Sequence, residues 1–240
     1  MRLGLLLVLV LGLSACGSAD EGDGDWWTHS PQGTRWVGHD GVVVAVPDWW
    51  TTGETQCGAP VEDTVYFDSG AVYDCDEPAD PAAVREVSSL AVLGDRGRYR
   101  TGDPDGECEE WLEGVCRRPF AVPGTDVVFA VTIADEGDGD YEEIRDSARV
   151  LPDGVTTVPL ATGPGGWTPA WGADPSAVRD LRRAVEDAGL SVEMETVEPD
   201  PNGDVADLPP GSLLDVEPVL GAPVVDGSTV TISVMGTPGS

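Results

Sequence analysis

The sequence predicts an α+β protein in which a mostly antiparallel domain precedes a smaller domain of one helix on a three-stranded sheet. Over residues 34–153, short β-branched segments alternate with turn signals, and one short amphipathic segment follows them. After residue 173, a capped helical pattern precedes three strand-like segments. We therefore expect five regions: a targeting segment over 1–15, a flexible acidic tether over 16–33, a disulfide-bonded domain over 34–153, a Gly/Pro/Trp-rich linker over 154–173 and the smaller domain over 174–236.

The N-terminus has the pattern of an export signal. Arg2 precedes an apolar run, Leu3–Leu11, which is shorter than the roughly 20 residues that a membrane-spanning helix needs. The run ends in Leu13-Ser14-Ala15-Cys16, which resembles the lipobox of bacterial lipoproteins. The resemblance implies that Cys16 carries lipid, and that the chain after it is extracytoplasmic and anchored to the cell membrane. The alternative is an ordinary signal peptide followed by an incidental cysteine.

The charge of the chain excludes two classes of partner. With 44 acidic against 13 basic residues, the formal net charge is -31. Nucleic-acid binding and electrostatic binding to an anionic membrane surface both need clustered Lys and Arg, so we expect neither. Every basic residue is an arginine, and together with the abundance of Gly, Ala, Val and Asp this is typical of a GC-rich, actinobacterial genome.

Four cysteines remain after Cys16, and in an exported chain an even number favours disulfides. Three pairings are open. We expect the local one, Cys57–Cys75 and Cys108–Cys116, because the residues between Cys57 and Cys75 have the pattern of a β-hairpin whose ends meet. A zinc site is the alternative, but neither pair has the close spacing of thiolate ligands.

The expected elements of the first domain follow the tether in order. Trp26 and Trp27 are large apolar residues within the tether, and we expect them to dock on this domain rather than enter the membrane interface. Strand patterns cover 41–46, 87–93 and 127–133, and Asp140 is a suitable N-cap for a helix over 141–149. The apolar face of that helix consists of Tyr141, Ile144 and Ala148.

Two resemblances cover parts of this domain. "GVVVAVPDWW", with "VVFAVTI" and "IRDSARVLPDG" downstream, is similar to the opening and closing elements of exported PsbP-like α/β sandwich domains. "CGAPVEDTVYFDSGAVYDC" resembles a stretch in uncharacterised actinobacterial envelope proteins. Neither resemblance implies catalytic residues or a ligand.

The smaller domain begins with a clear helix. Asp174-Pro175 is an N-cap followed by proline at the first helical position, and Gly189 is the C-terminal stop. Alternation over 190–196 predicts a half-buried strand, with Val192 and Met194 on its apolar face. Segments 213–216 and 229–234 predict two further strands.

These residues resemble a PASTA domain, the repeat found outside bacterial serine/threonine kinases and penicillin-binding proteins. The matching sequence is "AVRDLRRAVEDAGLSVE", followed by "PPGSLLDVEPVLGAPVVDGSTVTISV". The resemblance implies binding to peptidoglycan or muropeptides. The family opens with a Val-Pro-x-x-x-Gly strand close before the helix, whereas Val158-Pro159 here precedes a long Gly/Pro/Trp-rich stretch, so we expect that opening strand to be altered or absent.

Two tryptophans are the candidate ligand-binding residues. Trp167 and Trp171 lie just before the helix, and exposed aromatic faces suit sugar rings. The alternative is that both rings pack against the core. A second alternative is that the smaller domain is only a spacer.

Catalysis and metal binding have little support in the sequence. The chain has two histidines, His29 and His39, and no Gly-x-Ser-x-Gly or His-x-x-x-His pattern. The acidic segments 20–25 and 135–140 depart from the EF-hand spacing and are expected to be solvated turns. We therefore expect no enzyme, cofactor or metal, and a non-catalytic wall-binding or sensing accessory. The alternative is a lipoprotein that binds an envelope protein.

Overall fold

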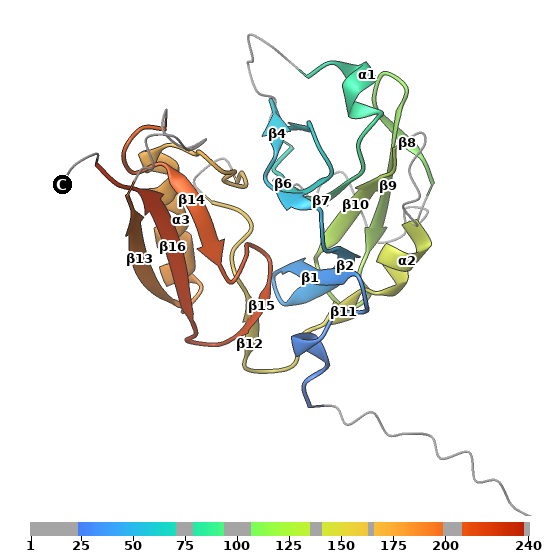
Figure 1. Cartoon of the computed structure of the whole chain (residues 1–240). Helices are drawn as coiled ribbons and strands as arrows, with labels where there is room; N and C mark the ends of the chain where they lie inside the picture. Colours follow the sequence, from blue (N-terminus) through green and yellow to red (C-terminus); the bar gives the residue numbers. More distant parts are fainter. Residues whose placement is uncertain are drawn as a thin grey trace, which may run out of the picture.

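The computed structural model describes residues 24–70, 79–93, 107–134, 141–162, 166–198 and 208–237. Cys16 and the rest of the lipobox lie outside these residues, as do Cys75 and the acidic segments 20–23 and 135–140. The described chain forms an N-terminal half and a C-terminal half that lie side by side (Figure 1). No helix in the described part is long and apolar enough to cross a membrane.

The first sheet of the N-terminal half has β2 at its centre. Among the described residues, its order is β1-β2-β11, with both pairs antiparallel. The strands are β1 (Thr34–His39), β2 (Val42–Pro47) and β11 (Arg149–Val150). Asp40 and Gly41 join β1 to β2 with φ of 47° and 76°, the two positive values that a tight type I′ hairpin turn requires.

The second sheet of this half is larger. In the described residues its order is β3-β6-β7-β10-β9-β8. The β3–β6 and β6–β7 pairs are parallel and the other pairs are antiparallel, so the expectation of a mostly antiparallel domain holds. The strands are β3 (Thr51–Thr52), β6 (Thr64–Asp68), β7 (Ser89–Leu93), β8 (Glu109–Leu112), β9 (Val115–Ala121) and β10 (Val128–Thr132).

Short elements complete the N-terminal half. A small ladder pairs β4 (Thr55–Gln56) with β5 (Ala59–Pro60), and helix α1 (Pro81–Val84) precedes β7. Helix α2 (Tyr141–Asp146) buries Tyr141 and Ile144, as its apolar pattern predicts. It ends before the expected residue 149 because the Ser147 hydroxyl accepts a hydrogen bond from the Ala45 amide, and the chain then pairs with β2 as β11.

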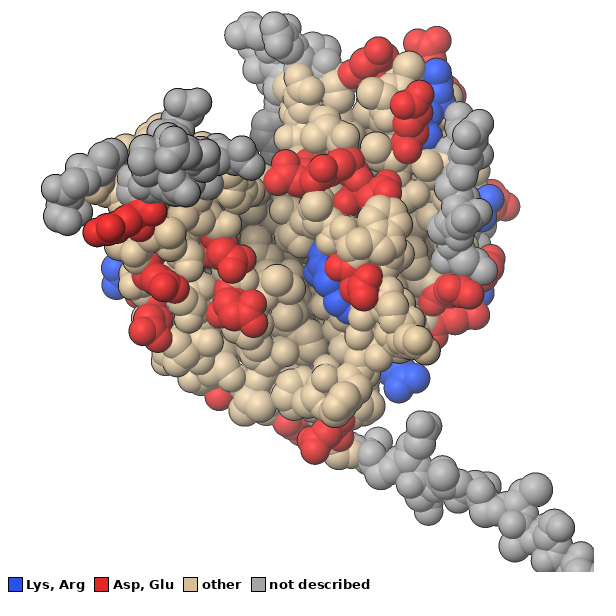
Figure 2. Space-filling model, viewed as in Figure 1, with Lys and Arg blue, Asp and Glu red and all other residues tan. Residues whose placement is uncertain are grey.

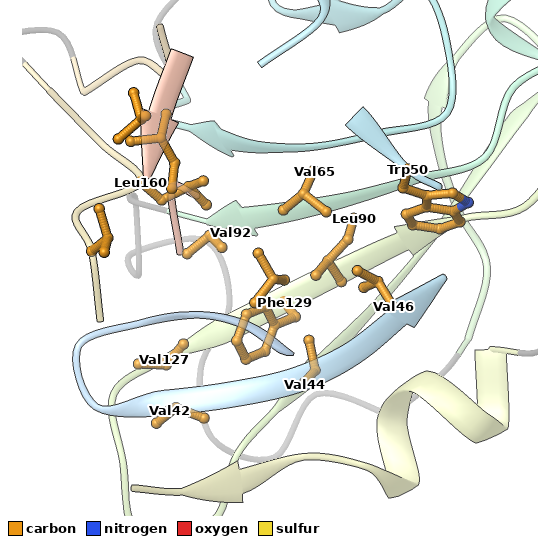
Figure 3. Close-up of a cluster of buried hydrophobic side chains, with 14 of the residues drawn as sticks. Val42, Val44, Val46, Trp50, Val65, Leu90, Val92, Val127, Phe129 and Leu160 are labelled. Carbon is orange, nitrogen blue, oxygen red and sulfur yellow. The ribbon is translucent and has the colours of Figure 1, made fainter. Parts of the chain in front are cut away.

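The inner face of β2 supplies the main core. Val42, Val44 and Val46 point towards the larger sheet, where they meet Leu90 and Phe129 (Figure 3). All of these side chains are almost completely buried. The period-2 alternation of the strand thus places one set of valines between the two sheets.

The outer face of β2 is also covered. Val43 and Ala45 pack with Trp36, and Trp26 and Trp27 cover this cluster from the 3₁₀ turn η1 (Trp26–Thr28). The rings of Trp26 and Trp36 meet edge to face, with centroids 5.3 Å apart. The expected docking of the tryptophan pair is therefore confirmed, and Trp26 and Trp27 of the expected tether contact the fold.

The C-terminal half is one helix with a three-stranded sheet, as expected for the described residues. The sheet order is β13-β16-β14, with β13 parallel and β14 antiparallel to the central strand. The elements are α3 (Pro175–Asp187), β13 (Ser191–Val197), β14 (Leu213–Glu217) and β16 (Thr229–Met235). One expectation was wrong: β13 is an edge strand that is mostly exposed, and Met194 is 43% exposed, because the sheet buries its central strand instead.

The expected linker contains a strand that joins the two halves. Strand β12 (Val155–Thr157) pairs antiparallel with β15 (Pro223–Val225) in the C-terminal half (Figure 1). Val158 and Leu160 follow β12 and are fully buried in a cluster that also contains residues of both halves. β12 ends just before Val158 and lies well ahead of α3 in the chain, so it is not a strand close before the helix, and the expectation of an altered or absent opening strand stays a prediction. The two halves share one core.

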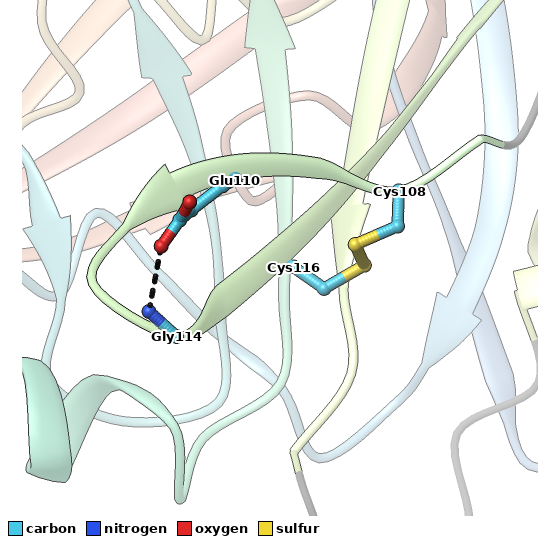
Figure 4. The surroundings of a disulfide bond; sticks show 4 residues. All are labelled: Cys108, Glu110, Gly114 and Cys116. Carbon is cyan, nitrogen blue, oxygen red and sulfur yellow. Dashed lines mark hydrogen bonds between the residues drawn. A yellow bond between two sulfur atoms is a disulfide. The ribbon is translucent and has the colours of Figure 1, made fainter.

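The disulfide expectation is confirmed in part. Within the described residues, Cys108 and Cys116 are bonded, with their Cα atoms 5.3 Å apart, at the open end of the β8–β9 hairpin (Figure 4). The amide of Gly114 donates to the Glu110 carboxylate in the turn of the same hairpin. Cys57 is also disulfide-bonded, but Cys75 lies outside the described residues, so their pairing stays a prediction.

Candidate functional site

A cleft of about 320 Å³ opens between the two halves, and we call it the central cleft. Arg35 and residues from 48–54 line it on the N-terminal side, and residues from 169–171 and 213–220 line it on the C-terminal side. Figure 2 shows this face hollowed between the halves, with acidic side chains on both sides of the hollow and a basic patch beside it.

The N-terminal wall is formed by the turn that ends β2. The amide of Trp50 donates to the Pro47 carbonyl, and this turn brings the Trp50 ring against the core with 3% exposure. In Figure 3, the indole nitrogen lies on the side of the ring away from the aliphatic cluster. The Trp50 Nε1 donor is buried and has no hydrogen-bond partner among the residues that the structure describes.

Arg35 is the cation of the central cleft. It lies in β1, and its Nη2 donates to three oxygens: the carbonyls of Trp50 and Thr51, at 3.0 Å each, and the Thr52 hydroxyl, at 2.9 Å. Its Nη1 is buried and has no partner in the described segments. Burial lowers the pKa of Arg35, because desolvation disfavours the charged form. Within the described ranges, the acceptors of this guanidinium are therefore all neutral.

The C-terminal wall holds Trp171 at a fixed place in the backbone. The amide of Gly172 donates to the Leu213 carbonyl at 2.8 Å, and the Leu213 amide donates to the Ala173 carbonyl at 2.9 Å. These bonds attach the segment before α3 to β14. The side chain of Trp171 is 52% exposed in the cleft.

The two walls meet at Glu54. Its carboxylate accepts a hydrogen bond from the Trp171 amide, which favours the ionised form. Burial raises the pKa of Glu54 and the nearby charge of Glu62 raises it further, and together these effects outweigh that bond. Beside this bridge Gly53 has φ of 87°, and a Cβ there would lie 2.9 Å from the carbonyl oxygen of Pro169. A glycine at this position allows the two walls to approach closely.

The structure separates the two predicted ligand-binding tryptophans. Trp171 lines the central cleft, whereas Trp167 is partly buried and lines a second cleft of about 290 Å³ with Cys57, Tyr66 and Thr168. Trp167 is held there by a short antiparallel bridge to Thr162. A sugar-binding role of either residue stays a prediction, but the two rings do not share one cleft.

A buried charged group supports the second cleft. Arg117 is 3% exposed, pairs with Asp68 at 2.7 Å and donates to the Tyr66 hydroxyl at 2.6 Å. Its guanidinium also stacks on Trp111, 3.7 Å from the ring centroid. Burial raises the pKa of Tyr66 to about 12, although the charge of Arg117 opposes this shift. These contacts fix β6 to β9.

The two histidines lie outside the central cleft, and the acidic side chains of the described residues do not gather into a metal-binding group. His29 bonds to the Thr28 hydroxyl in η1, and His39 packs against Phe67, so neither lines the central cleft. Across the described residues, no three His, Cys, Asp or Glu side chains form a group that could hold a metal ion.

Comparison of the chain with models of known protein families, with curated proteins and with solved structures finds no match.

Sequence reasoning missed Arg35 and Trp50. A signal was present: Arg35 is an arginine in an apolar strand of a chain that has 13 basic residues. The sequence does not show which residues surround Arg35, because the turn after β2 is what brings Trp50 and Thr52 next to it.

Proposed function

We propose that this chain is a membrane-anchored, extracytoplasmic lipoprotein that binds peptidoglycan fragments without catalysing a reaction, and that the central cleft is its ligand site. The observation that carries the proposal is the exposed indole of Trp171 beside the polar groups of the cleft. An aromatic face next to hydrogen-bonding groups suits a ligand with both sugar and peptide parts.

The sequence supplies the other support. The lipobox-like segment ending at Cys16 supports anchoring outside the cytoplasm, and the PASTA-like pattern of residues 174–236 supports a wall ligand. The strongly acidic surface is compatible with a neutral or zwitterionic ligand and unfavourable for a polyanion.

Sedimentation with purified peptidoglycan tests the ligand. The full chain, purified in detergent, should pellet with peptidoglycan, and Trp171→Ala should reduce the bound fraction at least fivefold. Trp49→Ala is the matched control, because Trp49 is 64% exposed but does not line the cleft. Point variants are preferable to removal of residues 154–240, since the halves share a core. Wild-type protein that stays in the supernatant would refute the proposal.

Metabolic labelling tests the anchor. In a bacterial host that lipidates exported proteins, the wild-type chain should incorporate a labelled fatty acid and partition with membranes. Cys16→Ala should lose the label and leave the membrane fraction. Equal labelling of the two would show that Cys16 is not the lipid site.

One observation favours a second function, binding of an envelope protein. Edge strand β13 exposes Met194 and Val197, which are 43% and 39% exposed, and edge strands are able to pair with a strand of another chain. Crosslinking in cells that is lost on Met194→Glu, with peptidoglycan sedimentation unchanged, would support this function.

A further inference from the structure

Two hydrogen-bond donors on residues that line the central cleft have no acceptor within the described part of the chain. They are Nη1 of Arg35 and Nε1 of Trp50, and both are shielded from water. Arg35 lies near the start of β1 and Trp50 follows the end of β2, at the same open end of this hairpin, and the bond from Arg35 Nη2 to the Trp50 carbonyl joins them. The two residues therefore belong to one region of the cleft wall.

Such donors are costly to a folded protein. A buried donor without an acceptor has given up its bond to water and gained none in return, and the cost is larger when the group is charged. Within the described part of the chain, Arg35 forms no ion pair, and its three acceptors are neutral. A negatively charged acceptor from outside the chain would offset this cost.

We propose that Arg35, with Trp50 beside it, forms a subsite for a carboxylate of a bound peptide. This inference rests on the proposed function, in which that peptide is the stem of a peptidoglycan fragment rather than its sugar chain. A planar guanidinium and a carboxylate are matched in geometry, and their hydrogen bonds are strong because both groups are charged. The exposed ring of Trp171 would cover the adjoining part of the ligand from the opposite wall.

The rim of the cleft restricts the peptide further. Asp48, Glu54 and Asp215 line the same cleft, so a ligand with several carboxylates and no positive charge would be repelled. A peptide that carries an amino group near its carboxylate satisfies both the guanidinium and the acidic rim. The subsite is therefore selective for a zwitterionic peptide end.

Calorimetric titration of the full chain in detergent with two peptides tests the subsite. The first is the tetrapeptide L-Ala-γ-D-Glu-L-Lys-D-Ala, and the second is the same peptide with both carboxylates amidated. We expect the amidated peptide to bind the wild-type protein at least tenfold more weakly. Equal affinities would overturn the inference. Because both titrations use the wild-type chain, the result does not depend on any variant folding.

Substitution of Arg35 tests whether this residue causes the difference in affinity between the two peptides. Arg35→Gln should remove the difference between the two peptides, and Arg35→Lys should restore part of it, since it keeps the charge but not the planar fork. Trp49→Ala should retain the full difference. If Arg35→Gln folds, as judged by its thermal unfolding, and still discriminates tenfold, another group holds the carboxylate and the inference is wrong.

These results separate the two proposals. Sedimentation with peptidoglycan, together with equal binding of the free and amidated peptides, would leave the wall-binding function in place and overturn the carboxylate subsite. Failure to sediment would overturn the wall-binding function itself.

Discussion

The backbone amide of Gly38 donates a hydrogen bond of 2.8 Å to the carbonyl oxygen of Gly221, and this bond joins β1 to the C-terminal half. The contact requires glycine at residue 221 for two reasons. Its φ is 81°, and a Cβ there would lie 2.6 Å from Cγ2 of Val37. Val37 is itself fully buried, so it has little room to move aside.

Gly221→Ala should therefore destabilise the protein by about 2–4 kcal/mol, as the sum of a left-handed backbone penalty and overpacking against Val37. Gly227→Ala is the matched control. Its φ is 77°, but no atom of the described residues lies within 4 Å of the added Cβ, so it should cost about 1 kcal/mol. Urea unfolding measures both. Equal losses would mean that the contact with Val37 is not tight.

Thr168 should be needed to attach the segment before α3 to the N-terminal half. Its hydroxyl oxygen accepts a 2.7 Å hydrogen bond from the Phe67 amide, and the residue is 6% exposed. Thr168→Val keeps the shape but leaves that amide without its partner, and should cost about 1–3 kcal/mol in urea unfolding. Thr168→Ser keeps the oxygen and should cost less than half as much. The reverse order would contradict this role of the hydroxyl.

The N-cap of α3 should make stability depend on pH in the acid range. The Ser176 hydroxyl and the amides of Ala177 and Ser176 donate to the Asp174 carboxylate and lower its pKa from the usual 3.8. Because the folded value is the lower one, this contribution is present above pH 3.8 and is lost as the pH falls through the folded pKa. Asp174→Asn keeps a capping acceptor but does not titrate. The difference in melting temperature between wild type and this variant should shrink on acidification, and a constant difference would rule out the shifted carboxylate.

Tyr66 should produce a separate loss of stability in alkali. Burial raises its pKa from 10 to about 12, so the unfolded chain releases this proton first as the pH rises. Stability is then lost between pH 10 and pH 12, by about 2–3 kcal/mol in total. Tyr66→Phe loses the bond from Arg117 and should be less stable at pH 8, but this alkaline component should be absent. Parallel stability curves for the two proteins would contradict the assignment.

Local patterns were sufficient to predict several elements. β2 and β10 are β-branched runs between turn residues, and α3 has its cap, proline and apolar spacing within one short segment. In each case the residues that decide the structure are neighbours in the chain. The same is true of the β8–β9 disulfide, whose cysteines are 8 residues apart.

Features that depend on distant residues were not predicted. The pairing of β12 with β15 joins Val155 to Val225, and no local pattern shows that these two segments meet. The exposure of β13 has the same origin, since an alternating strand is half-buried only if another layer covers it. The central cleft also belongs to this class, because its walls come from segments on either side of the chain's midpoint.

Val158 and Leu160 belong to the hydrophobic cluster that contains residues of both halves. This shared cluster determines whether the two walls of the cleft can move relative to each other. Separating the two walls would expose that cluster to water, and the free-energy cost would be about 25 cal/mol for each Å² of apolar surface exposed. The two walls are thus preorganised: a ligand enters a site whose width exists beforehand, and only the side chains of Arg35 and Trp50 have to shift to present their shielded donors. A temperature high enough to separate the walls would also unfold the protein, so ligand binding and the folded structure should be lost in one thermal transition.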